Sequence, residues 1–345
     1  MEDKQVTKSV NLVWTARDLE ETDWLRYLLG PLIRREVFAE QFEFVEPESL
    51  YVVSANKNLH SCIPRSFLMA IASVQGKGLI HVGDEYCAGG YDVYRTFEFV
   101  LRTYHSNWFK TVPEILTFPL GWGEGMPQRS SLKPVENRKY IWSFLGNQDA
   151  SSRPEMLQAL RQIEPQFVYV YTRGAGKTKR MASSEYHALL DDTVFSPCPM
   201  GNAMLESWRF YESLEAGCIP IIEARPWMHY HERLLGPHPI PAVYRWSQAR
   251  SLIQTLSKDP GRLKAMQRGI ANWWMQCKQS NQLKISAFIN ENMSSQEGRL
   301  STRRLPSTSL LWPMHQRIEL LRHQSVMSLF RRAKRPFARL AAKRF

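Results

Sequence analysis

The chain has 345 residues, of which 43% are hydrophobic, and it carries a formal net charge of +12. This length suits two domains with buried cores better than one. The charge is uneven, because residues 298–345 hold twelve Lys and Arg and a single acid, which leaves the first 297 residues almost neutral. A near-neutral body argues against a protein that binds nucleic acid over its surface, so no nucleic-acid partner is expected.

The start of the chain and its cysteines indicate a reducing compartment. Residues 1–14 lack a basic stretch followed by an apolar run, so no signal peptide is expected. No apolar run approaches the ~18 residues that span a bilayer. The five cysteines are widely spaced without a C-x-x-C motif, which predicts buried, reduced thiols. We therefore expect a cytoplasmic protein, peripheral on the cytoplasmic face of the inner membrane if its basic end binds there.

Residues 1–125 alternate short apolar runs with helical spacing, a pattern that favours a doubly wound α/β domain. The predicted strands are Val10–Trp14, Leu50–Val53, Leu79–Val82 and Ile115–Phe118. The predicted helices are Asp18–Glu36, Arg65–Val74 and Val93–Tyr104. Gly, Pro and Ser are then frequent over Gly121–Lys139, which predicts an interdomain linker at 126–139.

A second α/β series follows this linker. Its predicted strands are Tyr140–Leu145, Phe167–Tyr171, Thr193–Ser196 and Cys218–Glu223. Its predicted helices are Arg153–Ile163, Ser184–Leu190, Leu205–Ala216, Ser247–Lys258 and Gly261–Lys278. We expect a Rossmann-like domain over 140–258, closing helices over 259–297 and a basic tail over 298–345. Two similar α/β halves predict two domains that face a cleft, with a single large sheet as the alternative.

Residues 193–223 are the most informative stretch, where a strand, a Pro/Gly turn, an amphipathic helix and a second strand follow one another. This crossover implies parallel neighbouring strands. Such units bind ligands at the carboxyl end of the first strand and the start of the helix. At ~100° per residue, Arg209 and Glu212 share one face of the helix. They are either a weak exposed ion pair or a functional pair.

The order of residues around this pair is more specific than its spacing. It reads S-x-R-x-x-E-x-L-x-x-G-x-I-P-x-I from Ser207 to Ile222, preceded by C-P-x-G from Cys198 to Gly201. This pattern resembles the nucleotide-sugar half of the exostosin-type glycosyltransferases. The resemblance implies a GT-B fold of two Rossmann-like doubly wound domains. It also implies transfer of a sugar from a nucleotide sugar, expected to be a UDP-sugar, to a hydroxyl of a glycan or lipid-linked oligosaccharide.

Carried over to this chain, the resemblance assigns donor-side roles. Arg209 would hold the diphosphate as a bidentate cation, aided by Ser207 and the helix N-terminus, and Glu212 would accept hydrogen bonds from the ribose. The further donor-side candidates are Gly146, Arg153, Arg173, Pro199 and Gly201. The first two belong to a loop that is either the donor-side glycine loop of the family or an ordinary capped turn.

A general base for the acceptor hydroxyl is expected in the first domain. Asp84 and Glu85 follow a predicted strand and are the candidates, for an inverting single displacement. The alternative is a solvated loop or a helix cap. His81 on the strand is predicted to pack or to form a hydrogen bond. Arg102 either reaches an anionic group or is solvated at a helix end.

Other signals give no site. The G-K-T of residues 176–178 lacks the preceding glycine of a phosphate loop, since Tyr171 stands there. No D-x-D motif occurs, and His229 and His231 have no evident third ligand. No metal is expected, and no cofactor besides the nucleotide-sugar co-substrate. A fucosyltransferase-like GT-B enzyme is the runner-up, since it shares the helix–glycine–proline ending, although its Asn- and Lys-containing motif is missing.

Residues 310–345 interleave Arg and Lys with apolar residues near helical spacing. A basic amphipathic segment fits an anionic membrane surface, at about 1 kcal/mol per cation. Nucleic-acid binding and a solubilising tail are the alternatives. We expect the membrane, because enzymes that build lipid-linked glycans meet their acceptors there.

Overall fold

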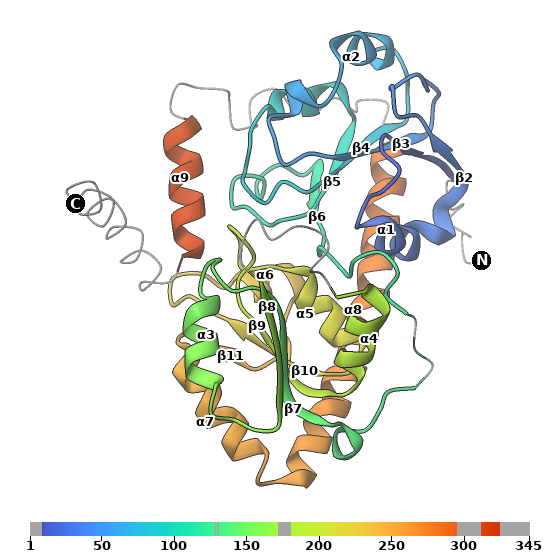
Figure 1. The fold of residues 1–345 in the computed structure, drawn as a ribbon. Coiled ribbons are helices and arrows are strands. Elements are labelled where there is room, and N and C mark those ends of the chain that lie inside the picture. The colour runs from blue at the N-terminus through green and yellow to red at the C-terminus, as the bar shows by residue number, and fades with distance from the viewer. Residues whose placement is uncertain (1–8, 128, 130, 172–180, 295–311, 325–345) are drawn as a thin grey trace, which may run out of the picture. The chain divides into compact units, whose positions relative to one another are not determined.

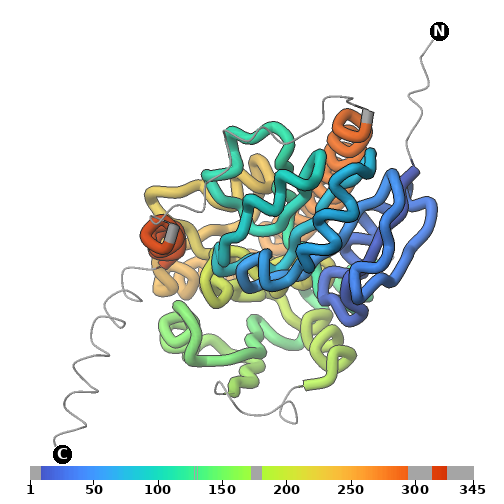
Figure 2. Tube along the Cα trace, turned by 90° about the horizontal axis from the view of Figure 1, so that it is seen from above, coloured from blue at the N-terminus to red at the C-terminus, as the bar shows by residue number. Residues whose placement is uncertain are grey.

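The structure is a computed structural model that describes residues 9–127, 129, 131–171, 181–294 and 312–324. These residues form two compact units. Unit 1 takes the described residues of 1–124 and 275–319, and unit 2 takes those of 125–274 and 320–345. The long helix α8 (Pro260–Ser294) begins in unit 2 and ends in unit 1. Helix α9 (Trp312–His323), seen from the side in Figure 1 and end on in Figure 2, begins in unit 1 and ends in unit 2.

Unit 1 is built on a six-stranded sheet, in the order β2-β1-β3-β4-β5-β6, with every pair of neighbours parallel. The strands are β1 (Val10–Trp14), β2 (Ile33–Phe38), β3 (Ser49–Ser54), β4 (Lys77–Val82), β5 (Phe99–Arg102) and β6 (Ile115–Thr117). The α-helices of its first 124 residues are α1 (Thr22–Leu29) and α2 (Arg65–Ile71). The four predicted strands and the helix over Arg65–Val74 are confirmed, with small shifts at their ends.

Of the predicted helices of this unit, one is wrong in part and one is wrong. The helix over Asp18–Glu36 ends at Leu29, because Gly30 and Pro31 turn the chain into a 3-10 turn, and β2 follows as an edge strand. The helix over Val93–Tyr104 is a 3-10 turn (Tyr91–Thr96) and the fully buried strand β5. A short apolar run that is buried on both faces fits either period, so spacing alone could not separate them.

Unit 2 is built on a five-stranded parallel sheet in the order β11-β10-β9-β7-β8. The strands are β7 (Tyr140–Asn147), β8 (Gln166–Tyr171), β9 (Thr193–Cys198), β10 (Ile219–Glu223) and β11 (Ala242–Val243). The helices are α3 (Arg153–Leu160), α4 (Ser183–Asp191), α5 (Trp208–Glu215), α6 (Tyr230–Leu235) and α7 (Trp246–Leu256). The four predicted strands are confirmed, while α6 and β11 were not predicted.

The helices divide between the two faces of this sheet. α3 and α7 pack together on one face, and α4 and α5 lie on the other (Figure 1). The chain leaves β7 for β8 on one side and then returns to β9 on the other side of β7. The carboxyl ends of β7 and β9 therefore form the topological switch point, where parallel α/β sheets bind ligands. Two parallel Rossmann-like sheets and helices in the C-terminal region confirm the predicted α/β fold class.

The segment that precedes β7 packs within unit 2. Arg138 is buried and donates hydrogen bonds to the carbonyl oxygens of Thr193 at 2.7 Å and Ala216 at 2.8 Å. Gly217 has φ +66°, and a Cβ there would lie 2.7 Å from Leu132. This glycine closes α5 and lets the segment approach the start of β10.

Candidate functional site

The loops that follow β7 and β9 are joined at the switch point of unit 2. The Ser151 hydroxyl of the first loop donates a hydrogen bond to the Met200 carbonyl of the second at 3.0 Å. Arg209, on the first turn of α5, donates to the Leu145 carbonyl of β7. Its guanidinium carbon lies 4.4 Å from the centre of the Phe144 ring, a cation–π contact. The arginine is thereby fixed against the end of the neighbouring strand.

Gly146 makes this approach possible. It has φ +155°, and a Cβ at this position would lie 2.9 Å from Nη2 of Arg209, too close for a real side chain. Gly146 is also the residue at which the sequence predicts that a small side chain allows close approach. In the described chain, the group that approaches is the guanidinium of Arg209.

Unpartnered polar atoms gather at the two helix starts beside the switch point. Among the described residues, no hydrogen-bond partner is found for the buried Oγ of Ser207, Nε1 of Trp208 or Nε of Arg209 at the start of α5, or for Oγ of Ser152 at the start of α3. Ser152 and Ser207 are the N-cap residues of these helices, yet neither hydroxyl caps its own helix. An N-cap serine normally bonds a backbone N–H of the first turn. Both hydroxyls are therefore without a hydrogen-bond partner within the described chain.

Glu212 lies one turn further along α5. Its carboxylate accepts a hydrogen bond from the Tyr186 hydroxyl of α4 at 2.9 Å. Burial and this carboxylate raise the pKa of Tyr186 well above its usual value, so the phenol stays a donor. Within the described chain Arg209 and Glu212 do not pair within 4.0 Å. The two side chains are therefore separate groups rather than a surface ion pair. No sequence motif indicates the contact with Tyr186.

The other donor-side candidates have different surroundings. Arg153 donates to the Asn147 carbonyl at 3.0 Å and so holds the end of β7. Pro199 and Gly201 are buried in the loop after β9, where the Gly201 N–H donates to the Met204 carbonyl at 2.8 Å. Arg173 lies outside the described residues. Arg209, Ser207 and Gly146 are thus the predicted residues that meet at the switch point.

The two predicted bases of unit 1 differ sharply. Asp84 is 1% exposed and accepts hydrogen bonds from Tyr91 Oη at 2.5 Å, Ala88 N at 2.7 Å and Arg102 Nη2 at 2.9 Å. Glu85 is only half buried. With three hydrogen bonds and 1% exposure, the Asp84 carboxylate is enclosed within unit 1 and out of reach of an acceptor hydroxyl. Of the two, Glu85 is the carboxylate that reaches the surface.

Arg102 is neither solvated nor at a helix end. It ends strand β5, is 0% exposed, and its guanidinium carbon lies 4.1 Å from the centre of the Phe109 ring. His81 packs as predicted, with its Nδ1 2.6 Å from the Tyr94 hydroxyl. Burial lowers the pKa of His81 to about 4, so the ring is neutral at pH 7. This cluster is the polar centre of unit 1.

Helix α9 adds contacts that the sequence did not indicate. In unit 2, the His323 carbonyl accepts from Arg225 Nε at 2.9 Å, and Nδ1 of His323 accepts from the Leu205 backbone N–H at 3.1 Å. The indole of Trp227 donates to the Arg322 carbonyl at 2.9 Å. In unit 1, Gln316 donates to the Tyr86 carbonyl at 2.8 Å. This part of the basic segment is therefore a packed helix.

Within the described ranges, no three His, Cys, Asp or Glu side chains are grouped as metal ligands. His231 is buried, with its pKa lowered to about 3 by burial. None of the described helices combines the length and apolarity needed to cross a membrane. The five cysteines are free thiols, four of them buried, as predicted, and burial raises the pKa of Cys198 to about 12.

Comparison with solved structures identifies the fold as GT-B, the two-domain fold of many glycosyltransferases. One crystal structure of an α1,3-fucosyltransferase matches with a TM-score of 0.51 and 10% identity, over 85% of this chain and 92% of that chain. A structure of α1,3-fucosyltransferase with GDP matches with a TM-score of 0.51 and 11% identity, over 86% and 94%. At such identity the likeness establishes the fold alone.

By sequence, residues 125–293 match the family model described as the RXYLT1 C-terminal domain. This match contains most of unit 2, including the switch point and α5. No curated protein matches the chain by sequence.

Proposed function

We propose that this protein is an exostosin-type glycosyltransferase that uses a nucleotide sugar, with a UDP-sugar as the expected donor. The observation that carries the proposal is the set of unpartnered polar atoms on two helix starts at the switch point of unit 2. Buried polar atoms are normally hydrogen-bonded, so a cluster of exceptions calls for a ligand. The match of residues 125–293 to the RXYLT1 C-terminal domain supports the same conclusion.

The chemistry of the cluster fits a diphosphate. Arg209 supplies a fixed cation, Ser207 and Ser152 supply hydroxyl donors, and the first backbone N–H groups of α5 point to the same end. These groups neutralise the charge that develops on the leaving phosphate. A fixed guanidinium in this place makes the proposed reaction independent of a metal. Glu212, oriented by Tyr186, accepts hydrogen bonds from the ribose hydroxyls.

The proposed reaction is a single displacement with inversion. The acceptor hydroxyl of a glycan or lipid-linked oligosaccharide gives its proton to the carboxylate of Glu85 in unit 1. Its oxygen forms a bond to the anomeric carbon while the bond to the phosphate oxygen breaks, and the nucleoside diphosphate leaves as an anion. General-base catalysis of this kind contributes roughly 10²–10⁴-fold to the rate. In Glu85→Gln, we expect turnover to fall by that factor while the affinity for the donor stays unchanged.

The test is calorimetric titration with UDP-, GDP- and CMP-sugars, each with and without EDTA. We expect UDP-sugar to bind in EDTA and Arg209→Ala to weaken binding at least tenfold. Arg209→Lys should weaken it also, because an ammonium lacks the two-pronged guanidinium geometry. The matched control is Arg250→Ala, an exposed arginine of α7. Equal donor affinity in Arg209→Ala and the parent protein would refute the proposal.

A fucosyltransferase-like enzyme is the second candidate, favoured by the similarity in fold to α1,3-fucosyltransferases. The same titration separates the two. Binding of GDP-sugar in preference to UDP-sugar would select this candidate over the exostosin type.

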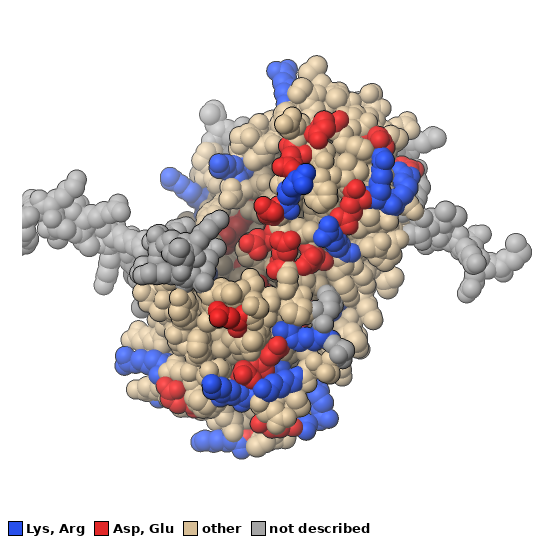
Figure 3. Space-filling view, turned by 45° about the vertical axis from the view of Figure 1, so that its right-hand side comes forward, with Lys and Arg blue, Asp and Glu red and all other residues tan. Residues whose placement is uncertain are grey.

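The basic segment 310–345 is proposed to place the enzyme on an anionic membrane from the cytoplasmic side. In its described part, the exposed side chains Met314, Ile318 and Leu321 follow one another at helical spacing on α9. Such an apolar stripe on a basic helix fits the interface of a bilayer. On the face drawn in Figure 3, by contrast, Lys and Arg are interspersed with Asp and Glu, unlike a basic patch for nucleic acid. Ile318→Glu should reduce sedimentation with phosphatidylserine vesicles, and unchanged sedimentation would contradict this role.

A further inference from the structure

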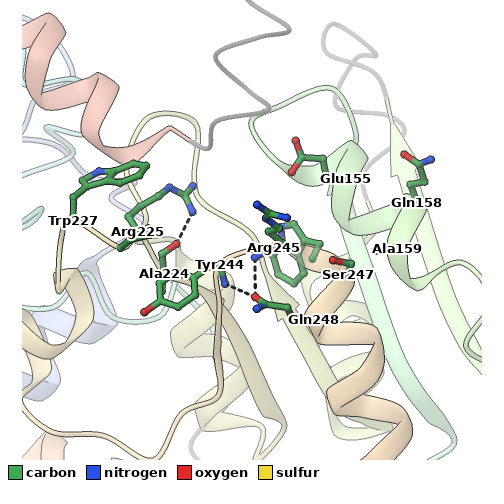
Figure 4. Close-up of a pocket in the computed structure, with 12 residues that line it drawn as sticks. Glu155, Gln158, Ala159, Ala224, Arg225, Trp227, Tyr244, Arg245, Ser247 and Gln248 are labelled. Atoms are coloured by element: carbon green, nitrogen blue, oxygen red, sulfur yellow. Dashed lines mark hydrogen bonds between the residues drawn. The ribbon is translucent and has the colours of Figure 1, made fainter.

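A large cavity lies on the α3/α7 side of the sheet of unit 2. It has a volume of about 930 Å³, at the upper end of the range for ligand pockets. Its walls come from α3, from the segment after β10 and from the start of α7. In Figure 4, Trp227 and Arg225 stand on one side, Glu155 and Gln158 on the other, and Tyr244 and Arg245 between them.

Aromatic side chains are prominent in this cavity. Trp227 is 48% exposed and Tyr244 is 56% exposed, while Trp246 is buried at 2%. Aromatic rings of this size are mostly buried in folded proteins. Neighbouring rings that stay exposed mark a candidate site for a ligand or partner. The indole N–H of Trp227 is bound to the Arg322 carbonyl of α9, so the ring is held in place with its face uncovered in part. The cavity therefore offers preformed aromatic surfaces.

The charges of the described residues that line the cavity balance one another. Arg225 donates to the carbonyl oxygens of His323 and Ala224 and pairs with Glu223 at 3.2 Å, so its charge is already compensated. Of the other lining residues, Arg245 is positive and Glu155 is negative. A cavity whose described lining has no net charge does not select a polyanion. Its hydrogen-bonding side chains suit a neutral, hydroxyl-rich ligand.

The floor of the cavity connects it to the proposed diphosphate site. Glu223, at the end of β10, accepts hydrogen bonds from Trp246 Nε1 at 2.5 Å and from the Met200 backbone N–H at 3.2 Å. Met200 lies in the loop between β9 and α5, which also carries Ser207. The proposed ribose contact, Glu212 with Tyr186, joins α5 and α4 on the opposite face of the sheet. The nucleoside and this cavity therefore belong to opposite sides of the diphosphate.

We propose that this cavity binds a neutral oligosaccharide, as a subsite for the glycan chain on which the enzyme acts. The proposal rests on the proposed function for its biological meaning, and on the cavity alone for binding. Pyranose rings present faces of polarised C–H groups, which stack on the negative faces of aromatic rings such as Tyr244 and Trp227. The polar side chains of Gln158 and Ser247 are placed to bind the hydroxyls at the rim.

The experiment is titration of the full-length protein, without nucleotide, with hexasaccharides of glucose, xylose and N-acetylglucosamine and with an acidic heparin hexasaccharide. We expect at least one neutral hexasaccharide to bind, and Tyr244→Ala and Trp227→Ala to weaken that binding at least tenfold. Tyr244→Phe keeps the ring and should retain the affinity. Tyr169→Ala removes a tyrosine of β8 that is 36% exposed and outside the cavity, and it should have no effect.

Three outcomes would overturn the proposal: no neutral hexasaccharide binds, binding is unaffected in the cavity variants, or only the heparin hexasaccharide binds. The donor titration is kept separate. Arg209→Ala should lose affinity for the nucleotide sugar and keep its affinity for the hexasaccharide. Tyr244→Ala should lose affinity for the hexasaccharide and keep its affinity for the nucleotide sugar. Failure of the cavity proposal is therefore distinguishable from failure of the proposed function.

Discussion

Two arginines near the carboxyl ends of parallel strands, Arg102 in unit 1 and Arg209 in unit 2, have opposite surroundings. Arg102 is 0% exposed and is paired with Asp84 at 2.9 Å, between aromatic rings. Arg209 is half buried, stacks on Phe144 and donates to a backbone carbonyl, and among the described residues its Nε has no partner. The first charge is paired within the fold, whereas the second has no counterion within the described chain.

This contrast distinguishes a charge that is paired inside the fold from a charge that the fold fixes without a counterion. A buried ion pair costs desolvation on both sides and is retained only with complete hydrogen bonding, as Asp84 has. A fixed cation without a counterion is unfavourable for folding alone, so its presence favours a role in binding. Of the predicted sites, the one on α5 has this character, and Asp84 does not.

Removal of Arg102 should have the largest effect on stability. Arg102→Ala leaves the Asp84 carboxylate buried without its cation, which costs about 3–5 kcal/mol of unfolding free energy. In Arg209→Ala we expect less than about 1 kcal/mol, because no buried carboxylate of the described chain loses its partner. Urea unfolding of the two variants beside the parent protein measures both values. Similar losses in the two variants would abolish the distinction between the arginines.

Glu21 provides a second buried charge in unit 1, and its effect depends on pH. It is 3% exposed, and burial raises its pKa from 4.5 to about 7. The folded chain therefore binds more protons than the unfolded chain between these values, and the unfolding free energy falls as the pH rises through that range. Glu21→Gln replaces the ionisable carboxyl with a neutral amide, so the unfolding free energy no longer falls for this reason as the pH rises. The variant should be more stable than the parent by up to about 3 kcal/mol at pH 8 and by nothing at pH 4.

Urea unfolding at both pH values measures the difference. The neighbouring exposed carboxylate gives the control, since Glu20→Gln should reduce the pH dependence only slightly: the charge of Glu20 raises the pKa of Glu21, but much less than burial does. A Glu21→Gln protein that loses stability with pH as steeply as the parent would show that burial of this side chain does not govern its proton.

Much of the fold could be predicted from the sequence, because parallel strands buried on both faces have continuous apolar runs. Leu50–Val53 and Ile219–Ile222 are such runs, and both lie in strands. The same property misled the prediction over Val93–Tyr104, where the run Phe99–Arg102 fits a buried helix equally well. Pattern alone therefore gives the class of fold with more certainty than the type of each element.

The parts of the candidate site that lie close together in the sequence could be predicted, whereas the parts that the fold brings together could not. Ser207, Arg209 and Glu212 lie within six residues, so a motif could assign them together. Asp84 and Arg102 are eighteen residues apart, and their pairing arises because β4 and β5 are neighbours in the sheet. Tyr186 and the cavity of Trp227 and Tyr244 depend on several elements meeting in space. Sequence spacing carries no information on such contacts.

The close approach of Arg209 to β7 depends on Gly146. Gly146→Ala adds a Cβ that would lie 2.9 Å from Nη2 of Arg209, so the guanidinium has to move from its place over Phe144. We expect the affinity for the nucleotide sugar to fall about tenfold, or about 1.4 kcal/mol. Calorimetric titration of the variant measures the change. A double variant with Arg209→Ala should show no further loss from Gly146→Ala, because the clash is then absent.

The smallest loss of unfolding free energy is expected from substitution of an exposed arginine of unit 1. This arginine serves as the reference for the buried Arg102. Arg17 pairs with Glu40 at 2.5 Å, but the two side chains are 70% and 51% exposed. Water and salt screen such a pair, so Arg17→Ala should cost less than about 1 kcal/mol, and less still in 1 M NaCl. Urea unfolding in low and high salt measures this. The loss in Arg102→Ala should persist in salt, because the Asp84 carboxylate is out of reach of the ions. Equal salt dependence for the two arginines would mean that burial is not what distinguishes them.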